Sequence, residues 1–145
     1  MLGDRGIAED TTQDIFMKLF TRLVKFEGKS KFSTWVYSVT YNHCIDLIRR
    51  GKSRQQIVQV EDLNKLPERV DEISDAALLE LKVHELERAL KAIKPDDRAI
   101  LLMKYQDGMS IKEIGSALRK SDSAVKMQLK RAKARVYELA RPGSE

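Results

Sequence analysis

Apolar residues recur at three- and four-residue steps along most of this 145-residue chain. This is the period of helices that bury one face, so the chain is predicted to be mainly helical. The first helix is expected from about Ile7 to Val24, before a break at Gly28. Its predicted apolar stripe contains Thr12, Ile15, Phe16, Leu19 and Leu23.

A second helix is expected from Ser33, a fair N-cap, to about Arg50, with Gly51 ending it. One face carries Val36, Val39, His43 and Leu47, and the opposite face carries Trp35, Ser38, Asn42, Asp46 and Arg49. Residues 51–74 show no sustained period and contain Pro67, which predicts a linker with room for a short helical turn.

Two further helices are expected after the linker. The first runs from about Asp75 to Ile93 with a stripe of Leu79, Val83, Leu86, Leu90 and Ile93. The next has Pro95 in its first turn and continues to about Tyr105, before the stop at Asp107-Gly108.

The last third of the chain has the pattern of a helix-turn-helix. Ser110 and Glu113 form a predicted capping box that opens a short helix, and residues 119–122 form a turn. Ser123 is a candidate cap for the next helix, whose predicted buried stripe is Val125, Leu129, Ala132, Val136 and Leu139. The fold class is therefore all-α, with two small helical domains, residues 1–50 and 75–145, joined by a linker at 51–74.

Composition supports this interpretation and indicates the cellular compartment. Gly and Pro are scarce, with 7 and 3, which favours helix. Cys44 is the single cysteine, so no internal disulfide can form and a reducing cytoplasm is expected. No apolar run approaches the roughly 20 residues that a membrane span needs, so we expect no membrane insertion.

Charge is distributed in blocks, with net charges of +4 over residues 1–60, −5 over 61–97 and +6 over 98–145. Basic surfaces at both ends suit a polyanion held at two places. In the helix-turn-helix, the positions near the start of the second helix would face base edges, and later basic positions would hold phosphates. The predicted base-edge residues are Ser123, Lys126, Met127 and Gln128, and the predicted phosphate-binding residues are Lys130, Arg131 and Lys133.

These residues resemble a known family. The stretch from Lys94 to Leu102, the helix-turn-helix and the run Leu129-Lys130-Arg131-Ala132 are similar to the C-terminal domain of bacterial RNA polymerase sigma factors, most closely the extracytoplasmic-function branch. The segments 8–16 and 32–50 independently resemble the clamp-docking and promoter-melting parts of the N-terminal domain.

The resemblance implies core RNA polymerase, promoter DNA and an anti-sigma factor as partners. The C-terminal domain would recognise the −35 element, and the N-terminal domain would open the −10 element, with an aromatic ring and cations to hold unstacked bases. The implied −10 residues are Lys29, Lys31, Phe32, Trp35, Asn42, Arg49 and Arg50. The implied polymerase-binding residues are Asp10, Gln13, Asp14 and Phe16.

The chain departs from the family pattern in three ways. The family has more helix before the segment that opens here, so we expect exposed apolar faces in the N-terminal domain, which self-association could cover. Gly115 stands where alanine is common, at a cost of up to about 1 kcal/mol. Arg119 stands where glycine often allows a left-handed turn, so a standard turn would give Arg119 a positive φ.

Two other functions remain open at this point. One is a stand-alone dimeric regulator, and the other is a docking module for polymerase or an inhibitor that does not bind DNA. An enzyme is not expected: the histidines are His43 and His84, and no catalytic, metal or phosphate-loop motif is present. We therefore expect no catalytic residues, no metal and no cofactor.

Overall fold

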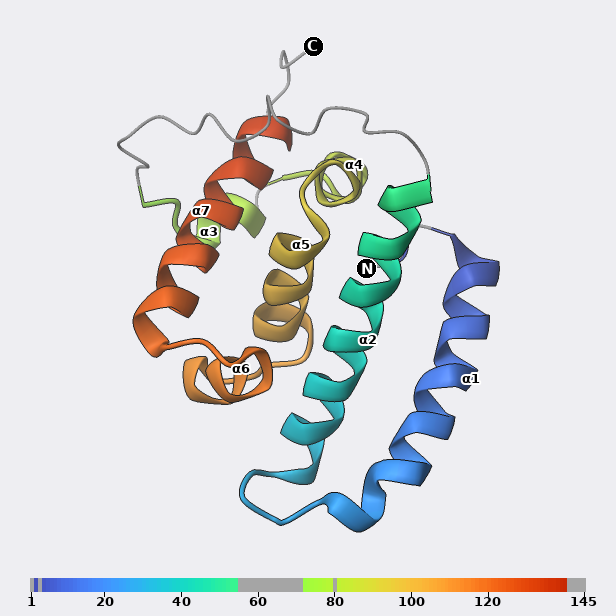
Figure 1. The fold of residues 1–145 in the computed structure, drawn as a ribbon. Helices are drawn as coiled ribbons and strands as arrows, with labels where there is room; N and C mark the ends of the chain where they lie inside the picture. The colour runs from blue at the N-terminus through green and yellow to red at the C-terminus, as the bar shows by residue number, and fades with distance from the viewer. Residues whose placement is uncertain (1, 3, 55–71, 80, 141–145) are drawn as a thin grey trace.

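A computed structural model describes residues 2, 4–54, 72–79 and 81–140, and for 52–54 and 79 it describes the backbone alone. Every regular element in these residues is helical, which confirms the all-α prediction (Figure 1). The elements are α1 (Arg5–Arg22), η1 (Leu23–Lys25), α2 (Phe32–Arg54), α3 (Asp75–Leu79), α4 (Val83–Ala92), α5 (Pro95–Leu101), η3 (Leu102–Gln106), α6 (Ile111–Leu118) and α7 (Asp122–Ala140).

Helices α1 and α2 form an antiparallel hairpin, and Asp4 caps α1 by accepting a hydrogen bond from the backbone N–H of Ile7 at 2.9 Å. The apolar stripe predicted for α1 is only partly correct. Thr11 and Ile15 are the buried residues of α1, whereas Thr12 and Phe16 are exposed. Since α2 covers one narrow side of α1, most of its apolar side chains remain in solvent.

The predicted bounds of α2 were wrong at both ends. The helix begins at Phe32, and the N–H of Trp35 bonds the carbonyl of Lys31, so Ser33 lies inside the first turn and is not the N-cap. The helix continues through Gly51 to Arg54. A glycine inside a helix costs about 1 kcal/mol, which the rest of this long helix offsets.

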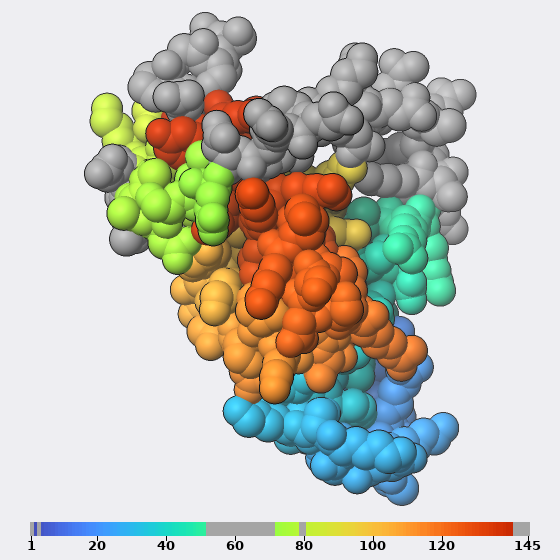
Figure 2. Space-filling model, turned by 90° about the vertical axis from the view of Figure 1, so that its left-hand side faces the viewer, coloured from blue at the N-terminus to red at the C-terminus, as the bar shows by residue number. Residues whose placement is uncertain are grey.

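Helix α2 is buried on two sides, and the sequence predicted only one of them. Val39 lies on the predicted apolar face, but Tyr41, Cys44 and Ile45 on another face are buried as well. Tyr41 and Ile45 belong to the same core as Ile100 and Ile114 of the C-terminal helices. Figure 1 shows the reason: α2 lies between α1 and the C-terminal helices, which touch it directly, and in Figure 2 the orange C-terminal residues lie against the cyan residues of α2.

The helix predicted from Asp75 to Ile93 is broken in two. Helix α3 ends at Leu79, the N–H of Leu81 bonds the carbonyl of Leu78, and α4 starts only at Val83. No Gly or Pro explains the break. Helix α3 contacts the later helices, because Asp75 accepts hydrogen bonds from Tyr105 and Lys133, both at 2.9 Å. Ala89 of α4 and Ile93, its C-cap residue, are buried in the core, but Val83 is 73% exposed, contrary to the predicted stripe.

Helix α5 begins with Pro95 in its first turn, as predicted, and its last turn widens into the π-helix η3. The helical segment ends before Asp107 and Gly108, also as predicted, and Gly108 has a φ of 67°. The N–H of Met109 bonds the carbonyl of Met103 at 2.9 Å, which turns the chain towards α6. Residues 55–71, with the predicted linker's Pro67, lie outside the described residues.

Candidate nucleic-acid interface

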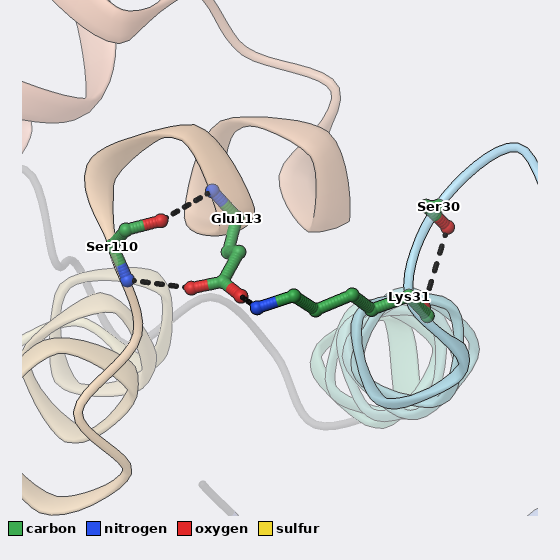
Figure 3. A network of polar contacts seen from close by, with 4 residues as sticks. All are labelled: Ser30, Lys31, Ser110 and Glu113. Atoms are coloured by element: carbon green, nitrogen blue, oxygen red, sulfur yellow. Dashed lines mark hydrogen bonds and ion pairs between the residues drawn. The ribbon is translucent and has the colours of Figure 1, made fainter.

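Helix α6 starts with the capping box that the sequence predicts. The Ser110 hydroxyl accepts a hydrogen bond from the N–H of Glu113 at 3.2 Å, and a Glu113 carboxylate oxygen accepts one from the N–H of Ser110 at 2.9 Å (Figure 3). This fixes the direction of α6, and Ile114 and Ala117 are then fully buried.

The turn between α6 and α7 confirms the prediction for Arg119, which has a φ of 55° and a ψ of 45°. In this conformation the N–H of Lys120 bonds the carbonyl of Gly115 at 2.9 Å. The backbone therefore folds back tightly on α6. A Cβ atom on Gly115 would lie 2.8 Å from the carbonyl oxygen of Lys120, so this turn needs glycine at position 115.

We predict that Arg119→Gly stabilises the protein by up to about 1 kcal/mol. The left-handed conformation costs an L-residue roughly 1–2 kcal/mol, which glycine avoids. Glycine is also more flexible in the unfolded chain, and this offsets about half of the gain in folding free energy. Urea unfolding measures the difference. The matched control is Arg131→Gly in the middle of α7, which should lose about 1 kcal/mol. Equal destabilisation by both substitutions would contradict the prediction.

Helix α7 begins one residue before the predicted cap. The Ser121 hydroxyl accepts a hydrogen bond from the N–H of Ala124 at 3.2 Å, so Ser121 is the capping residue and Ser123 lies in the first turn. The predicted buried stripe is confirmed for Val125, Leu129, Ala132 and Val136, and Leu139 is half-buried. The stripe packs α7 against α4, α5 and α6.

The predicted DNA-binding residues of α7 fall into two groups. Ser123, Lys126, Met127 and Arg131 are exposed, and Lys130 is half-buried. Gln128 and Lys133 face other helices instead. Gln128 donates to Asp97 at 2.9 Å and accepts from Lys120 at 2.5 Å, and Lys133 donates to Asp75. These inward contacts rank Lys126 and Met127 above Gln128 and Lys133 as DNA contacts, and all seven assignments stay predictions.

Aromatic rings gather where α2 begins. The centroids of Phe26 and Phe32 are 5.5 Å apart, and the Trp35 centroid is 5.4 Å from Phe26 and 5.7 Å from Phe32. Phe32 is 51% exposed, and the other two are half-buried. In such a cluster an exposed ring provides a surface on which a base can stack, and the neighbouring rings hold that ring in place.

The other predicted −10 residues surround this aromatic cluster or lie further along α2. Asn42, Arg49 and Arg50 are exposed, and the Asn42 amide reaches the Ser38 hydroxyl at 3.5 Å. Lys29 pairs with Glu27, and Lys31 pairs with Glu113. The basic loop is therefore partly neutralised, by Glu27 of the loop itself and by Glu113 of α6.

The residues predicted to contact polymerase lie on the open side of α1. Asp10, Gln13 and Asp14 are exposed, and Phe16 is 68% exposed. Met17 and Phe20, which the predicted apolar stripe does not include, extend the same apolar surface. Their exposure agrees with the expectation of open apolar faces in the N-terminal part, and large exposed apolar surfaces mark binding sites.

An ion pair joins the N-terminal loop to the helix-turn-helix: the Lys31 ammonium lies 2.6 Å from a Glu113 carboxylate oxygen (Figure 3). Hydrogen bonds from Lys31 and from Ser110 lower the pKa of Glu113 to about 2. The two residues are 82 positions apart, so no local pattern could have predicted the pair.

The low pKa of Glu113 predicts a pH-dependent contribution to stability. Since the folded-state pKa lies below the ordinary value of 4.5, the contribution is complete above pH 4.5 and is lost as the pH falls from about 4.5 to about 2. We therefore expect Glu113→Gln to unfold more easily than the original protein at pH 7, with the difference shrinking towards pH 2.5.

Urea unfolding at both pH values measures this difference. Lys31→Ala is the matched variant, because it removes the ion pair and leaves the capping box intact. Its loss at pH 7 should be smaller than that of Glu113→Gln. A gap between the Glu113→Gln variant and the original protein that stays constant with pH would contradict the interpretation.

The described residues contain no group of three or more His, Cys, Asp or Glu side chains placed to hold a metal ion. Cys44 is buried, and burial raises the pKa of its thiol. Each described helix is too short or too polar to cross a bilayer.

Two family models match this chain in order. The model of Sigma-70 region 2 matches residues 1–54, and that of Sigma-70 region 4 matches residues 84–136. The ECF RNA polymerase sigma factor SigW of Bacillus subtilis is 31% identical over 140 residues, covering 92% of this chain and 75% of SigW. SigX of the same species is 30% identical over 129 residues, covering 87% of this chain and 66% of SigX.

Coverage varies among the relatives. A probable RNA polymerase sigma factor, RfaY of Xanthomonas campestris, is 31% identical over 92% of this chain, but the match spans only 34% of RfaY. Among solved structures, the sigma factor RpoE in complex with the anti-sigma factor NepR from Bartonella quintana has a TM-score of 0.69 at 24% identity, covering 95% of this chain and 83% of RpoE. That likeness concerns the fold.

Proposed function

This chain belongs to the extracytoplasmic-function (ECF) family of RNA polymerase sigma factors, and we propose that it binds core RNA polymerase and directs it to specific promoters. In this proposal the helix-turn-helix reads the −35 element and the surface around Trp35 holds the melted −10 element. The protein acts by binding and is not an enzyme.

The observation that carries the proposal is the exposed start of α7. A capped α6 and a tight turn present Ser123, Lys126 and Met127 to solvent, while Val125 and Leu129 fix the opposite side of α7 in the core. The major groove admits one helix, and residues near its N-terminus reach base edges. Lys126 would accordingly read a base edge, and Lys130 and Arg131 would hold phosphates.

The N-terminal hairpin supports the other two contacts. The rings of Phe32 and Trp35 provide a stacking surface for an unpaired base, and the exposed Arg49 and Arg50 can approach the DNA backbone. On α1, the acidic residues Asp10 and Asp14 and the ring of Phe16 are all exposed, which suits a partner surface with both basic and apolar parts.

The structure also suggests how such a factor could be kept inactive. Lys31, which the −10 contact would use, is paired with Glu113 of the helix-turn-helix, and Tyr41 and Ile45 tie α2 to the C-terminal core. Promoter binding at two separated elements would require this contact to open. We propose an anti-sigma factor as a partner that shifts the balance between this closed arrangement and an open one, in which α2 separates from the C-terminal helices. The related fold of CnrH was solved with the cytosolic domain of CnrY, with a TM-score of 0.62 at 22% identity, covering 94% of this chain and 72% of CnrH.

The deciding experiment is transcription in vitro with purified core polymerase and a library of random promoters, followed by sequencing of the transcripts. We expect starts that share a −35 and a −10 sequence, and loss of the −35 preference in the double variant Lys126→Ala and Lys130→Ala. Firm binding to core polymerase with no selected starts would favour a docking module. Tight duplex binding without polymerase, at paired half-sites, would favour a stand-alone regulator.

A further inference from the structure

A basic cavity of about 310 Å³ lies where the N-terminal hairpin meets the helix-turn-helix. Its cations come from both parts of the chain: Arg22 and Lys25 from the end of α1 and η1, and Arg119 from the turn before α7. All three side chains are exposed, and none of them forms an ion pair within the described residues.

The remaining wall of the cavity is supplied by α2. Trp35 provides an aromatic surface, with Phe26 and Phe32 packed around its ring. Ser38 and Asn42 add a hydroxyl and an amide on the same side of the helix. The cavity thus combines one ring, two neutral hydrogen-bonding groups and three positive charges.

Within the part of the chain that the structure describes, no carboxylate lines this cavity. Positive charges gathered around one hollow raise the local potential and attract anions from solution. Guanidinium groups bind phosphate through pairs of hydrogen bonds, and a tryptophan ring takes the flat face of a base. The volume lies at the lower end of the range for small-molecule sites, roughly 300–1,000 Å³.

We propose that this cavity binds a free nucleoside diphosphate or triphosphate, with the base against Trp35 and the phosphates between Arg22, Lys25 and Arg119. The ligand would touch both the N-terminal hairpin and the helix-turn-helix. It therefore favours the closed arrangement, in which α2 packs against the C-terminal helices, because a ligand shifts an equilibrium towards the state in which it makes more contacts. Under the proposed function, bound nucleotide would compete with promoter opening, since Trp35 and Asn42 serve both.

Binding can be measured on the full chain without polymerase or promoter, so its failure is distinct from a failure in transcription. The probes are GDP, GTP, guanosine and inorganic pyrophosphate, titrated by calorimetry at constant ionic strength. Trp35 is the single tryptophan, so its fluorescence reports on the cavity directly. We expect saturable binding of GDP and GTP with quenching, at least tenfold weaker binding of pyrophosphate, and no binding of guanosine.

Arg119→Gly is the critical variant, because glycine accepts the positive φ at this position and removes the guanidinium without straining the turn. We expect it to weaken GDP binding at least tenfold, whereas Arg119→Lys should lose less. Lys112→Ala, on an exposed part of α6 outside the cavity, is the matched control and should bind normally.

Three results would overturn the proposal. The first is equal affinity for GDP and pyrophosphate, which would make the cavity a plain anion site. The second is GDP binding that Arg119→Gly leaves unchanged. The third is binding of single-stranded oligonucleotides but not of GDP, which would make the cavity part of the promoter surface alone.

Discussion

Replacing Lys126 and Lys130 together by alanine is expected to weaken binding to a −35 duplex by roughly 30- to 1,000-fold. A lysine that reads a base edge contributes about 1–3 kcal/mol, and a lysine at a phosphate adds about 1 kcal/mol of salt-dependent attraction. Each 1.4 kcal/mol is tenfold in affinity. Both side chains leave α7 away from the buried stripe, so the fold should survive their loss.

Fluorescence anisotropy at two salt concentrations measures this effect on a duplex selected by the transcription experiment. The matched control is Lys82→Ala with Lys91→Ala. These two lysines of the α4 region are exposed and lie outside the proposed −35 residues, and their loss removes the same charge. This control should lose only the general attraction to DNA. If both pairs weakened binding equally, α7 would have no special role in reading the sequence.

Local signals were enough to predict the helix-turn-helix. The capping box at Ser110, the proline at position 95 and the buried stripe of α7 each act within a few residues, so each can be recognised along the chain. The errors in the predicted helix bounds also come from relying on local signals. Ser121 and Ser123 are both good caps, and only the observed hydrogen bond to Ala124 decides between them.

Contacts between distant segments could not be predicted in this way. Periodicity indicated one buried face for α2, but Tyr41 and Ile45 lie on a second face that is buried only because the C-terminal helices lie there. The hydrogen bonds from Tyr105 and Lys133 to Asp75 likewise join residues 30 and 58 positions apart, so no local pattern indicates them. For the candidate site, the sequence pattern indicated polar and basic residues suited to DNA contact. It could not show that Gln128 faces Asp97 instead of solvent.

Gly115→Ala is the substitution for which sequence and structure predict opposite results. Helix propensity alone favours alanine by up to about 1 kcal/mol, and alanine is common at this place in the resembling family. The new Cβ would lie 2.8 Å from the carbonyl oxygen of Lys120, with Val125 Cγ2 3.8 Å away. A backbone atom cannot rotate aside as a side chain can, so the turn must open.

We expect Gly115→Ala to lower the free energy of unfolding by about 1–3 kcal/mol, the usual cost of forcing extra volume into a packed site. Gly51→Ala is the matched control, because Gly51 also lies in a helix and a Cβ added there would meet no neighbouring atom within 4 Å, so it should gain about 0.5–1 kcal/mol. Urea unfolding of both variants measures the contrast. Since the displaced carbonyl belongs to the residue after Arg119, Gly115→Ala should also tilt the start of α7 and weaken −35 binding. Equal stabilisation by the two alanines would show that the turn adapts freely and that α7 is not held by it.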